Sequence, residues 1–236
     1  MDWKIIAWKY KSMYRFKAYF NRVIMKYFSQ ILVFALATVF AKAADNQKKG
    51  YTPHVVVPEE LEATLFSPNT LTPCVACIGV APTGEVYAGV DQIGSLGKGG
   101  GKGKIIRLID ADHDGISEAH TVYAVIDNPR GIVPVGDKLY VLHTKWGEGK
   151  KFEGMFLSVL EDKDVDGKAD GPPKHLVKEI SSRKFNQARG VDHTTNGIRM
   201  GIDGWIYVAI GDFGFVDATG TDGAKLTMYG GGVIRV

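Results

Sequence analysis

The sequence lacks several signals by which function is commonly recognised. It has only two cysteines among 236 residues, which excludes a framework of several disulfides and a four-thiolate zinc site. The apolar run at residues 31–41 is too short to span a bilayer as a helix. No long stretch with the 3.6-residue helical period follows it, so we expect helices to be minor in the folded part.

A basic surplus is also missing once the beginning of the chain is set aside. The formal net charge is +3, but residues 1–43 hold eight Lys and Arg and a single Asp. Residues 44–236 hold 21 basic and 25 acidic residues, so this part is mildly acidic. A domain that grips nucleic acid carries a basic footprint, and we therefore expect no nucleic-acid partner.

The basic beginning is typical of a targeting segment. Lys26 precedes the apolar run, and Ala41-Lys42-Ala43 follows the small-residue pattern of a signal cleavage site. We predict a leader and signal peptide at residues 1–43, cleaved near Ala43, and export to the periplasm or the extracellular space. An uncleaved anchor is the alternative. The polar residues 44–57 then form a linker, and residues 58–236 form the folded domain.

Cys74 and Cys77 form a C-x-x-C pair with no histidine after it, so the pair is not a covalent haem site. No thioredoxin-like βαβ pattern surrounds it, which argues against a redox dithiol. We expect two small buried residues near a strand.

Three segments of the folded part share one pattern. Each has a short apolar strand, a turn with glycine and a second apolar strand that contains a tyrosine, which is typical of β-hairpins. They begin at Gly79, Gly131 and Gly197 and reach Tyr87, Tyr140 and Tyr207. An apolar run and an acidic loop follow each of the first two hairpins. Residues 231–236, after the third, match the opening strand of the same unit.

A unit of four short strands that recurs every 50–65 residues or so predicts an all-β fold, a β-propeller, with one blade per unit. A β-sandwich is the alternative, but it does not require an equal-interval repeat. About three blades fit into residues 58–236, whereas propellers close with at least about four. We therefore expect an amino-terminal fragment of a larger ring, prone to aggregate through its open edges and inactive by itself.

The two acidic loops both read D-x-D-x-D-G-x-x-[D/E]. Side chains at positions 1, 3 and 5 of a tight loop converge on one point, and glycine at position 6 permits the sharp turn. Calcium takes six to eight oxygen ligands at about 2.3–2.6 Å, and four carboxylates crowded without a cation would repel one another. The predicted calcium ligands are Asp110, Asp112, Asp114, Glu118, Asp162, Asp164, Asp166 and Asp170. The closing glutamate of an EF-hand is absent, and a polar turn without metal is the alternative.

Polar residues gather just before the third hairpin. A neutral histidine can take the proton of a hydroxyl group while a hydride leaves the same carbon. His193 is the candidate for such a base, and either Asp192 or Asn196 could hold its tautomer. A polar cap on a blade, satisfied by the backbone, is the alternative for His193.

The run from His193 to Asp212 reads H-x-x-x-G-I-R-M-G-x-D-G-W-I-Y-V-x-x-G-D. It resembles the run H-x-x-(x)-G-x-L-x-F-G-x-D-G-x-L-Y-V-x-x-G-D of the glucose/sorbosone dehydrogenases, and the resemblance spans roughly residues 58–236. It is similar above all to the exported, membrane-bound dehydrogenase-like proteins of planctomycete-type bacteria, which share an opening like residues 58–66.

The resemblance implies a six-bladed propeller that uses pyrroloquinoline quinone (PQQ). It implies hydride transfer from a sugar or alcohol to the quinone, with His193 as base, and a cytochrome c as electron acceptor. It also allows membrane association through the full-length protein. The residues that grip the PQQ carboxylates come mostly from later blades in that family, so none is assigned; Arg189 and Arg199 are candidates by position only.

Two other functions remain open. One is a non-catalytic, calcium-stabilised propeller that binds carbohydrate or protein. The other, a lactonase-like hydrolase, would need a catalytic divalent metal in the central channel, and no set of carboxylates and histidines in the sequence clearly provides one.

Overall fold

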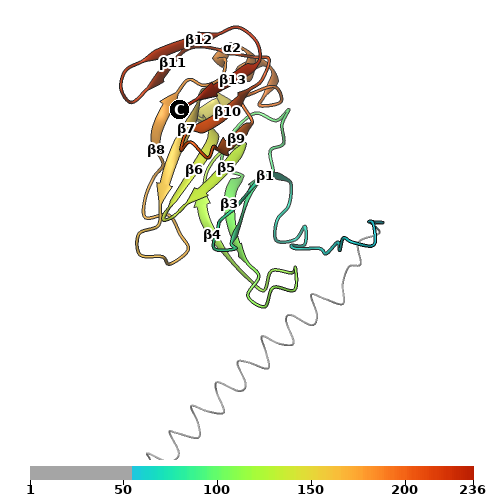
Figure 1. Cartoon of the computed structure of the whole chain (residues 1–236). Helices are drawn as coiled ribbons and strands as arrows, with labels where there is room; N and C mark the ends of the chain where they lie inside the picture. Colours follow the sequence, from blue (N-terminus) through green and yellow to red (C-terminus); the bar gives the residue numbers. More distant parts are fainter. Residues whose placement is uncertain (1–54) are drawn as a thin grey trace, which may run out of the picture. The chain divides into compact units, whose positions relative to one another are not determined.

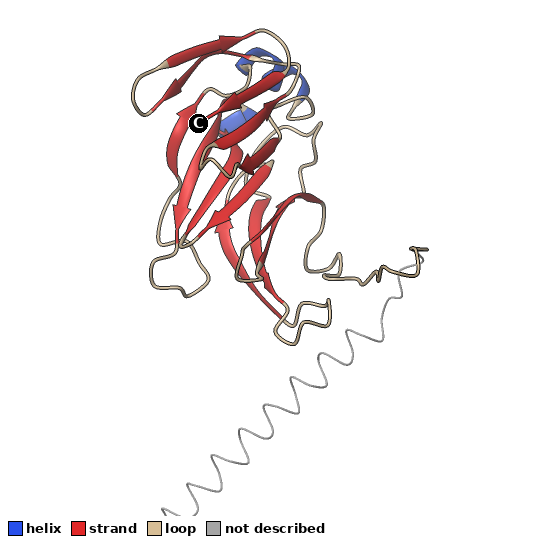
Figure 2. Cartoon of the chain, viewed as in Figure 1, coloured by secondary structure: helices blue, strands red, loops and turns tan. Residues whose placement is uncertain are grey.

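Antiparallel strands in three sheets are the main regular structure of the described chain (Figures 1 and 2). The computed structural model describes residues 55–236, and the compact unit is Val57–Val236. The predicted leader and signal peptide at residues 1–43 and most of the predicted linker at residues 44–57 lie outside the described residues. Among the described residues, no helix combines the length and the apolar character that crossing a bilayer requires.

The first sheet is a four-stranded meander in which each strand pairs with the next along the chain. Its strands are β1 (Val75–Val80), β2 (Val86–Asp91), β3 (Gly103–Ile109) and β4 (Ala119–Val125). Short turns separate β1 from β2, whereas a glycine-rich loop joins β2 to β3 and the first acidic loop joins β3 to β4.

The second sheet repeats this meander and is extended at its far edge. Its strands are β5 (Gly131–Val135), β6 (Lys138–Trp146), β7 (Phe152–Glu161) and β8 (Lys174–Lys178), with the 3₁₀ helix η1 (Glu148–Lys150) between β6 and β7. Nearly every residue of β7 is buried, because neighbouring elements cover both faces of this sheet. The second acidic loop lies in the connection from β7 to β8.

The third sheet has three strands, in the order β13-β10-β9. They are β9 (Gly197–Met200), β10 (Ile206–Ile210) and β13 (Gly232–Arg235), and helix α2 (Arg183–Arg189) precedes them. A hairpin of β11 (Phe215–Gly220) and β12 (Lys225–Met228) is inserted between β10 and β13, and β11 pairs with β8 of the second sheet. Residues 231–236 thus supply a third strand, as expected, whereas the inserted hairpin and α2 were not predicted.

The recurring tyrosines occupy the same place in the three sheets. Each lies on the second strand and pairs with a residue of the first, in the pairs Tyr87–Gly79, Tyr140–Val133 and Tyr207–Arg199. The repeat predicted from the sequence is therefore confirmed, but aligning the three segments by their first glycines was wrong. Gly79 corresponds to Val133, so the first segment was aligned two residues out of register with the others.

The first strands of successive sheets lie side by side, β1 next to β5 and β5 next to β9. Glycine makes this close approach feasible, because a Cβ atom on Gly79 would lie 2.8 Å from the carbonyl oxygen of Ile132. A Cβ atom on Gly131 would likewise lie 2.6 Å from Cγ2 of Ile198. Meanders that follow one another with their first strands adjacent are consecutive blades, so the described unit is a partial β-propeller of three blades.

Apolar side chains fill the space between neighbouring blades. Between the first and second blades the core cluster is Ile105, Tyr123, Ile126, Ile132, Leu139, Val141 and Leu160. Between the second and third it includes Leu142, Met155, Leu157, Ile198, Ile206 and Val208. This packing holds the polar ends of the inner strands in fixed positions relative to one another.

Candidate functional site

Each acidic loop joins the third strand of its blade to the fourth, where the sequence repeat places it. The first, residues 110–118, fills the whole connection between β3 and β4, and the second, residues 162–170, begins directly after β7. The two loops have one backbone shape. Their fourth residues, His113 and Val165, both have φ 59°, and their glycines, Gly115 and Gly167, have φ 80° and 84°.

The same hydrogen bonds close both loops. The first carboxylate accepts the backbone N–H of the glycine, from Gly115 to Asp110 at 2.9 Å and from Gly167 to Asp162 at 3.0 Å. The last carboxylate folds back to accept the N–H of the second residue at 2.8 Å in both loops. Two segments 52 residues apart thus adopt one conformation, because the local motif determines it.

The loops differ in how many carboxylates they bring together. In the first, oxygens of Asp110, Asp112, Asp114 and Glu118 all lie within 4.8 Å of one another. In the second, only those of Asp162, Asp164 and Asp166 do so, and Asp170 is not in the group. Burial raises the pKa of Asp162, and the neighbouring charges of Asp166 and Asp164 act in the same direction. Both clusters offer converging carboxylate oxygens, which suit a hard cation.

His193 lies between two carboxylates just before the third blade. Its Nδ1 is 2.6 Å from Oδ1 of Asp212, and its Nε2 is 3.2 Å from Oδ2 of Asp192. The side chain is 40% exposed, so solvent and small molecules can reach it. Of the two partners considered from the sequence, Asp192 contacts the ring. The backbone N–H of Asn196 instead donates to the carbonyl of Ala209.

The partner that sequence reasoning missed is Asp212, which follows β10. Nineteen residues separate it from His193, and only the pairing of β9 with β10 brings the two together. The position was visible at the end of the run that resembles the dehydrogenases, but no residue pattern indicated its contact with the histidine.

Aromatic and basic groups cover the other side of the histidine. The ring of His193 stacks on the ring of Phe213, with the two centroids 5.5 Å apart. The guanidinium of Arg189 lies 5.6 Å from the centroid of the Phe213 ring. Arg189, at the end of α2, also lies 3.9 Å from Asp192. Arg189 is therefore close to the histidine, as its position suggested, whereas Arg199 belongs to β9.

A buried polar network lies beside this cluster. Asp91, 2% exposed, accepts hydrogen bonds from Arg130 at 2.6 Å and from the side-chain amide of Asn128 at 3.1 Å. Burial lowers the pKa of Arg130, while the negative charges of Asp91 and Asp192 act in the opposite direction. The buried Nε of Arg130 has no hydrogen-bond partner among the described residues. No pattern in the sequence pointed to Asp91, Asn128 or Arg130.

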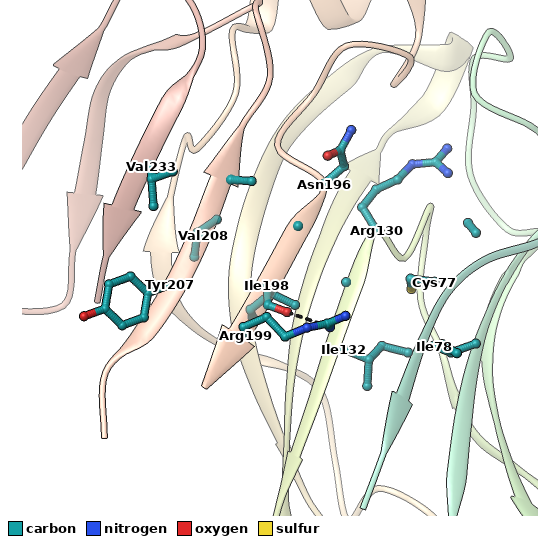
Figure 3. Close-up of a pocket in the computed structure, with 14 residues that line it drawn as sticks. Cys77, Ile78, Arg130, Ile132, Asn196, Ile198, Arg199, Tyr207, Val208 and Val233 are labelled. Carbon is teal, nitrogen blue, oxygen red and sulfur yellow. Dashed lines mark hydrogen bonds between the residues drawn. The ribbon is translucent and has the colours of Figure 1, made fainter. Parts of the chain in front are cut away.

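Arg130 also borders a cavity of about 480 Å³ along the inner strands β1, β5 and β9 (Figure 3). Figure 3 shows Arg130 and Asn196 near one end of these strands, with Arg199 farther along, where it donates to the carbonyl of Ile198 at 3.1 Å. The cavity combines apolar walls with a few polar groups, as small-molecule sites do. His193 is not among its lining residues.

The cysteine prediction is only partly correct. Both cysteines are free, and Cys77 on β1 is partly buried, but Cys74 is exposed. Burial raises the pKa of the Cys77 thiol to about 12, so this side chain stays protonated at neutral pH. A redox role for the pair has no support in this geometry.

A second histidine cluster is enclosed in the second blade. The hydroxyl of Ser158 lies 2.8 Å from Nε2 of His143 and 2.8 Å from Nδ1 of His175. Nδ1 of His143 lies 2.9 Å from the carbonyl oxygen of Thr144, so the buried ring donates there. Burial lowers the pKa of His143 to about 4, and it also lowers the pKa of His175.

Fold and site together define a partial β-propeller with two acidic hairpins and a polar histidine cluster beside its inner strands. The chain belongs to a family described as a domain of unknown function, DUF7133, whose model matches residues 57–236. No curated protein matches the chain.

Two solved structures are similar to the chain at low identity. One is an oxidoreductase described as a glucose dehydrogenase from Thermus thermophilus, with 15% identity, a TM-score of 0.41, and coverage of 60% of this chain and 38% of that one. The other is the PQQ-bound aldose sugar dehydrogenase from Streptomyces coelicolor, with 14% identity, a TM-score of 0.42, and coverage of 64% and 45%. The match spans less than half the length of either structure, and so weak a likeness says nothing about activity.

Proposed function

We propose that the chain is the amino-terminal part of an exported sugar or alcohol dehydrogenase-like propeller, in which His193 is the general base. The observation that carries this proposal is the 2.6 Å contact between Nδ1 of His193 and Asp212. When Asp212 accepts the Nδ1 proton, the tautomer is fixed and the lone pair of Nε2 can accept the proton of a substrate hydroxyl group.

Asp192 has to give way for this chemistry. Its carboxylate lies 3.2 Å from Nε2, where a substrate hydroxyl group would bind. Arg189 can hold the displaced carboxylate, since its guanidinium is already 3.9 Å away. The exposure of both side chains permits this rearrangement without disturbing the core.

PQQ is the proposed cofactor, and it would supply the hydride acceptor. It carries carboxylates, so its site needs cationic and amide donors. Arg189 lies beside the proposed base, and Arg130, with its unpartnered Nε, and Asn196 line the cavity; these donors fit a carboxylate-bearing molecule in kind. The proposal further includes a cytochrome c as electron acceptor and membrane association through the full-length protein.

We propose a structural role for calcium, bound by the two acidic loops. The cation would relieve the repulsion among the clustered carboxylates and fix the outer hairpins of the first two blades. Extracellular sites of this kind have dissociation constants of about 10⁻⁴–10⁻³ M. At 10 mM calcium, each site would then stabilise the fold by about 1–3 kcal/mol.

Calorimetry on protein freed of metal by a chelator tests the calcium sites. Calcium should give binding heat and raise the melting temperature, and magnesium should do so far less. Asp112→Asn together with Asp164→Asn should remove both effects, while Asp203→Asn, outside the loops, should remove neither. Protein that shows no heat and no thermal shift with calcium would dismiss this role.

One observation favours the alternative of a non-catalytic, calcium-stabilised propeller that binds carbohydrate or protein. Both ring nitrogens of His193 already contact carboxylates, as in a histidine that only stabilises its surroundings. Dye reduction by the full-length protein with added PQQ and calcium decides between the two. His193→Ala should lower the rate by about 10²–10⁴-fold, as the loss of a general base does, and Asp212→Asn should lower it as well.

His120→Ala, at an exposed position on β4, is the matched control and should keep full activity. A His193→Ala protein that reduces the dye at the wild-type rate would remove His193 from the mechanism. A wild-type protein that reduces no dye with any sugar or alcohol, yet binds carbohydrate, would establish the alternative.

A further inference from the structure

Another cavity, of about 360 Å³, lies between the first and second blades. The turn from β1 to β2 (residues 81–85) and the turn from β5 to β6 (residues 136–137) line it, together with part of the second acidic loop. In each meander these connections lie at one end of the strands, whereas His193 precedes β9 and lies at the other end. The first two blades alone supply all of the lining residues, and none belongs to the histidine cluster.

The inner end of this cavity is apolar and aromatic. Tyr123 on β4 and Leu139 on β6 line it and are only 3% and 1% exposed. The ring of Tyr123 meets the ring of Tyr87 edge to face, with centroids 5.3 Å apart. Pro82 and Asp137 are exposed, so the two turns form the opening and the tyrosines form the floor. A volume above about 300 Å³ with mainly apolar walls is typical of a small-molecule site.

The hydroxyl group of Tyr123 has no hydrogen-bond partner among the described residues. Buried polar groups are nearly always hydrogen-bonded, so this exception calls for a partner from outside the chain. The hydroxyl group is not sealed off, because Nε of Arg130 is the only sealed, unpartnered side-chain atom in the described part of the chain. Burial raises the pKa of Tyr123, so its hydroxyl group keeps its proton and can both donate and accept.

The charges around the cavity leave no surplus of either sign for a ligand. Arg107 is already bound to Glu85, with 2.7 Å between Nη2 and Oε1. The carboxylate oxygens of Asp162 accept backbone N–H groups of its own loop. At the opening, Asp137 and Lys138 offer one charge of each sign, and neither forms an ion pair with another described residue. The site therefore suits a neutral molecule with several hydrogen-bonding groups.

We propose that this cavity binds a neutral saccharide. One sugar hydroxyl group pairs with the hydroxyl group of Tyr123 at the floor, and others pair with Asp137 and Lys138 at the opening. The C–H groups of the sugar pack against Leu139 and the tyrosine rings. The inference does not rest on the proposed reaction, because the cavity holds a saccharide whether or not His193 is a base.

Calorimetry on the purified full chain with glucose, galactose, mannose and cellobiose tests the proposal. At least one of these sugars should give a saturable binding heat at millimolar concentration. Tyr123→Phe should weaken that binding by about 10-fold, because it removes one hydrogen bond and keeps the ring. The substitution leaves no other described group without a partner, so the variant should fold and melt like the wild type.

Tyr140→Phe is the matched control. Tyr140 lies next to Leu139 on β6 but does not line the cavity, so its replacement should leave the affinity unchanged. A wild-type chain that binds none of the four sugars would overturn the proposal. An affinity that falls less than about 2-fold in Tyr123→Phe, or equally in both variants, would overturn it as well.

Photo-cross-linking of the wild-type chain locates the site without any substitution. A diazirine derivative of the sugar that binds should label peptides that contain residues 81–87 or 136–139, and excess unmodified sugar should prevent the labelling. Labelling confined to residues 189–213 would place the sugar beside His193 and overturn the proposal. Both experiments measure binding and not dye reduction, so failure of the proposed reaction is distinguishable from failure of this inference.

A free amino acid is the competing occupant, because its ammonium and carboxylate groups would match Asp137 and Lys138. Glutamine is the probe for this class. It should give no binding heat and should not compete with the photoreactive sugar. Glutamine that binds, is weakened by Tyr123→Phe and displaces the sugar derivative would assign the cavity to a zwitterion and overturn the saccharide.

Discussion

We predict that His143, the enclosed histidine of the second blade, makes the free energy of unfolding depend on pH. His143 is 3% exposed, and burial lowers its pKa from 6.5 to about 4 in the folded chain. The unfolded chain therefore binds a proton more readily than the folded chain between these values. The contribution of neutral His143 to the free energy of unfolding is fully present above about pH 6.5. It is lost as the pH falls from there to about pH 4, and the loss is complete below that value.

The magnitude follows from the two pKa values. Over the whole window the loss is about 3 kcal/mol, since each unit of pKa corresponds to about 1.4 kcal/mol. Between pH 8 and pH 5 it is about 2 kcal/mol. His175, which faces the same serine, has its pKa lowered by burial and by Lys178 and Lys145, so it adds a loss of the same sign.

Comparison of the wild-type protein with His143→Gln isolates the contribution of His143 to the pH dependence, because the other titrating groups are common to both proteins. Urea unfolding followed by tryptophan fluorescence at pH 8 and pH 5 gives the free energy of unfolding. The wild-type protein should lose about 2 kcal/mol more than His143→Gln over this range. His120→Gln, on exposed β4, controls for the removal of a histidine as such. Equal losses in wild type and His143→Gln would refute the reasoning.

Three further changes should have measurable effects. Asp91→Asn leaves a buried guanidinium without its charged partner, so urea unfolding should show a loss of about 3–5 kcal/mol; a loss below about 1 kcal/mol would contradict this. Iodoacetamide at pH 8 should label exposed Cys74 quickly and Cys77 only after denaturation, as peptide mass spectrometry would show; equal labelling would contradict the high pKa of Cys77. Gly190→Ala should lower the melting temperature more than Gly84→Ala. Both glycines have positive φ, but only the Cβ atom at position 190 would meet backbone, 2.6 Å from the carbonyl oxygen of Ser95. Equal shifts in melting temperature would contradict this.

The blade repeat and the acidic loops could be predicted from the sequence because both are local. A hairpin with its tyrosine, or a nine-residue loop with its glycine, adopts its shape through contacts within a dozen residues. The tyrosines are equivalent for this reason, although the glycines misplace the first alignment by two residues. Gly79 and Gly131 are glycines because the next blade approaches them closely, and the sequence of a single hairpin does not show this contact.

The histidine site was less accessible to sequence reasoning because its contacts cross the fold. His193 could be singled out by its surroundings, but Asp212 reaches it only once β9 and β10 are paired. The Arg130–Asp91 pair depends on two different blades and likewise has no local signature. Cys74 was expected to be buried, yet it lies just ahead of β1, outside the ladder that covers Cys77.

The segment just before β1 makes contacts that its own residue pattern does not predict. Residues 62–66 have neither the alternation of a half-buried strand nor a ladder partner among the described residues. They nevertheless contact the first acidic loop, because the hydroxyl group of Thr64 donates to the carbonyl oxygen of Gly115 and the carbonyl oxygen of Phe66 accepts the N–H of Ser117. Phe66 also packs against the core cluster of the first blade, where it is partly buried. The position of this segment is therefore set by the blade against which it packs and not by its own sequence pattern.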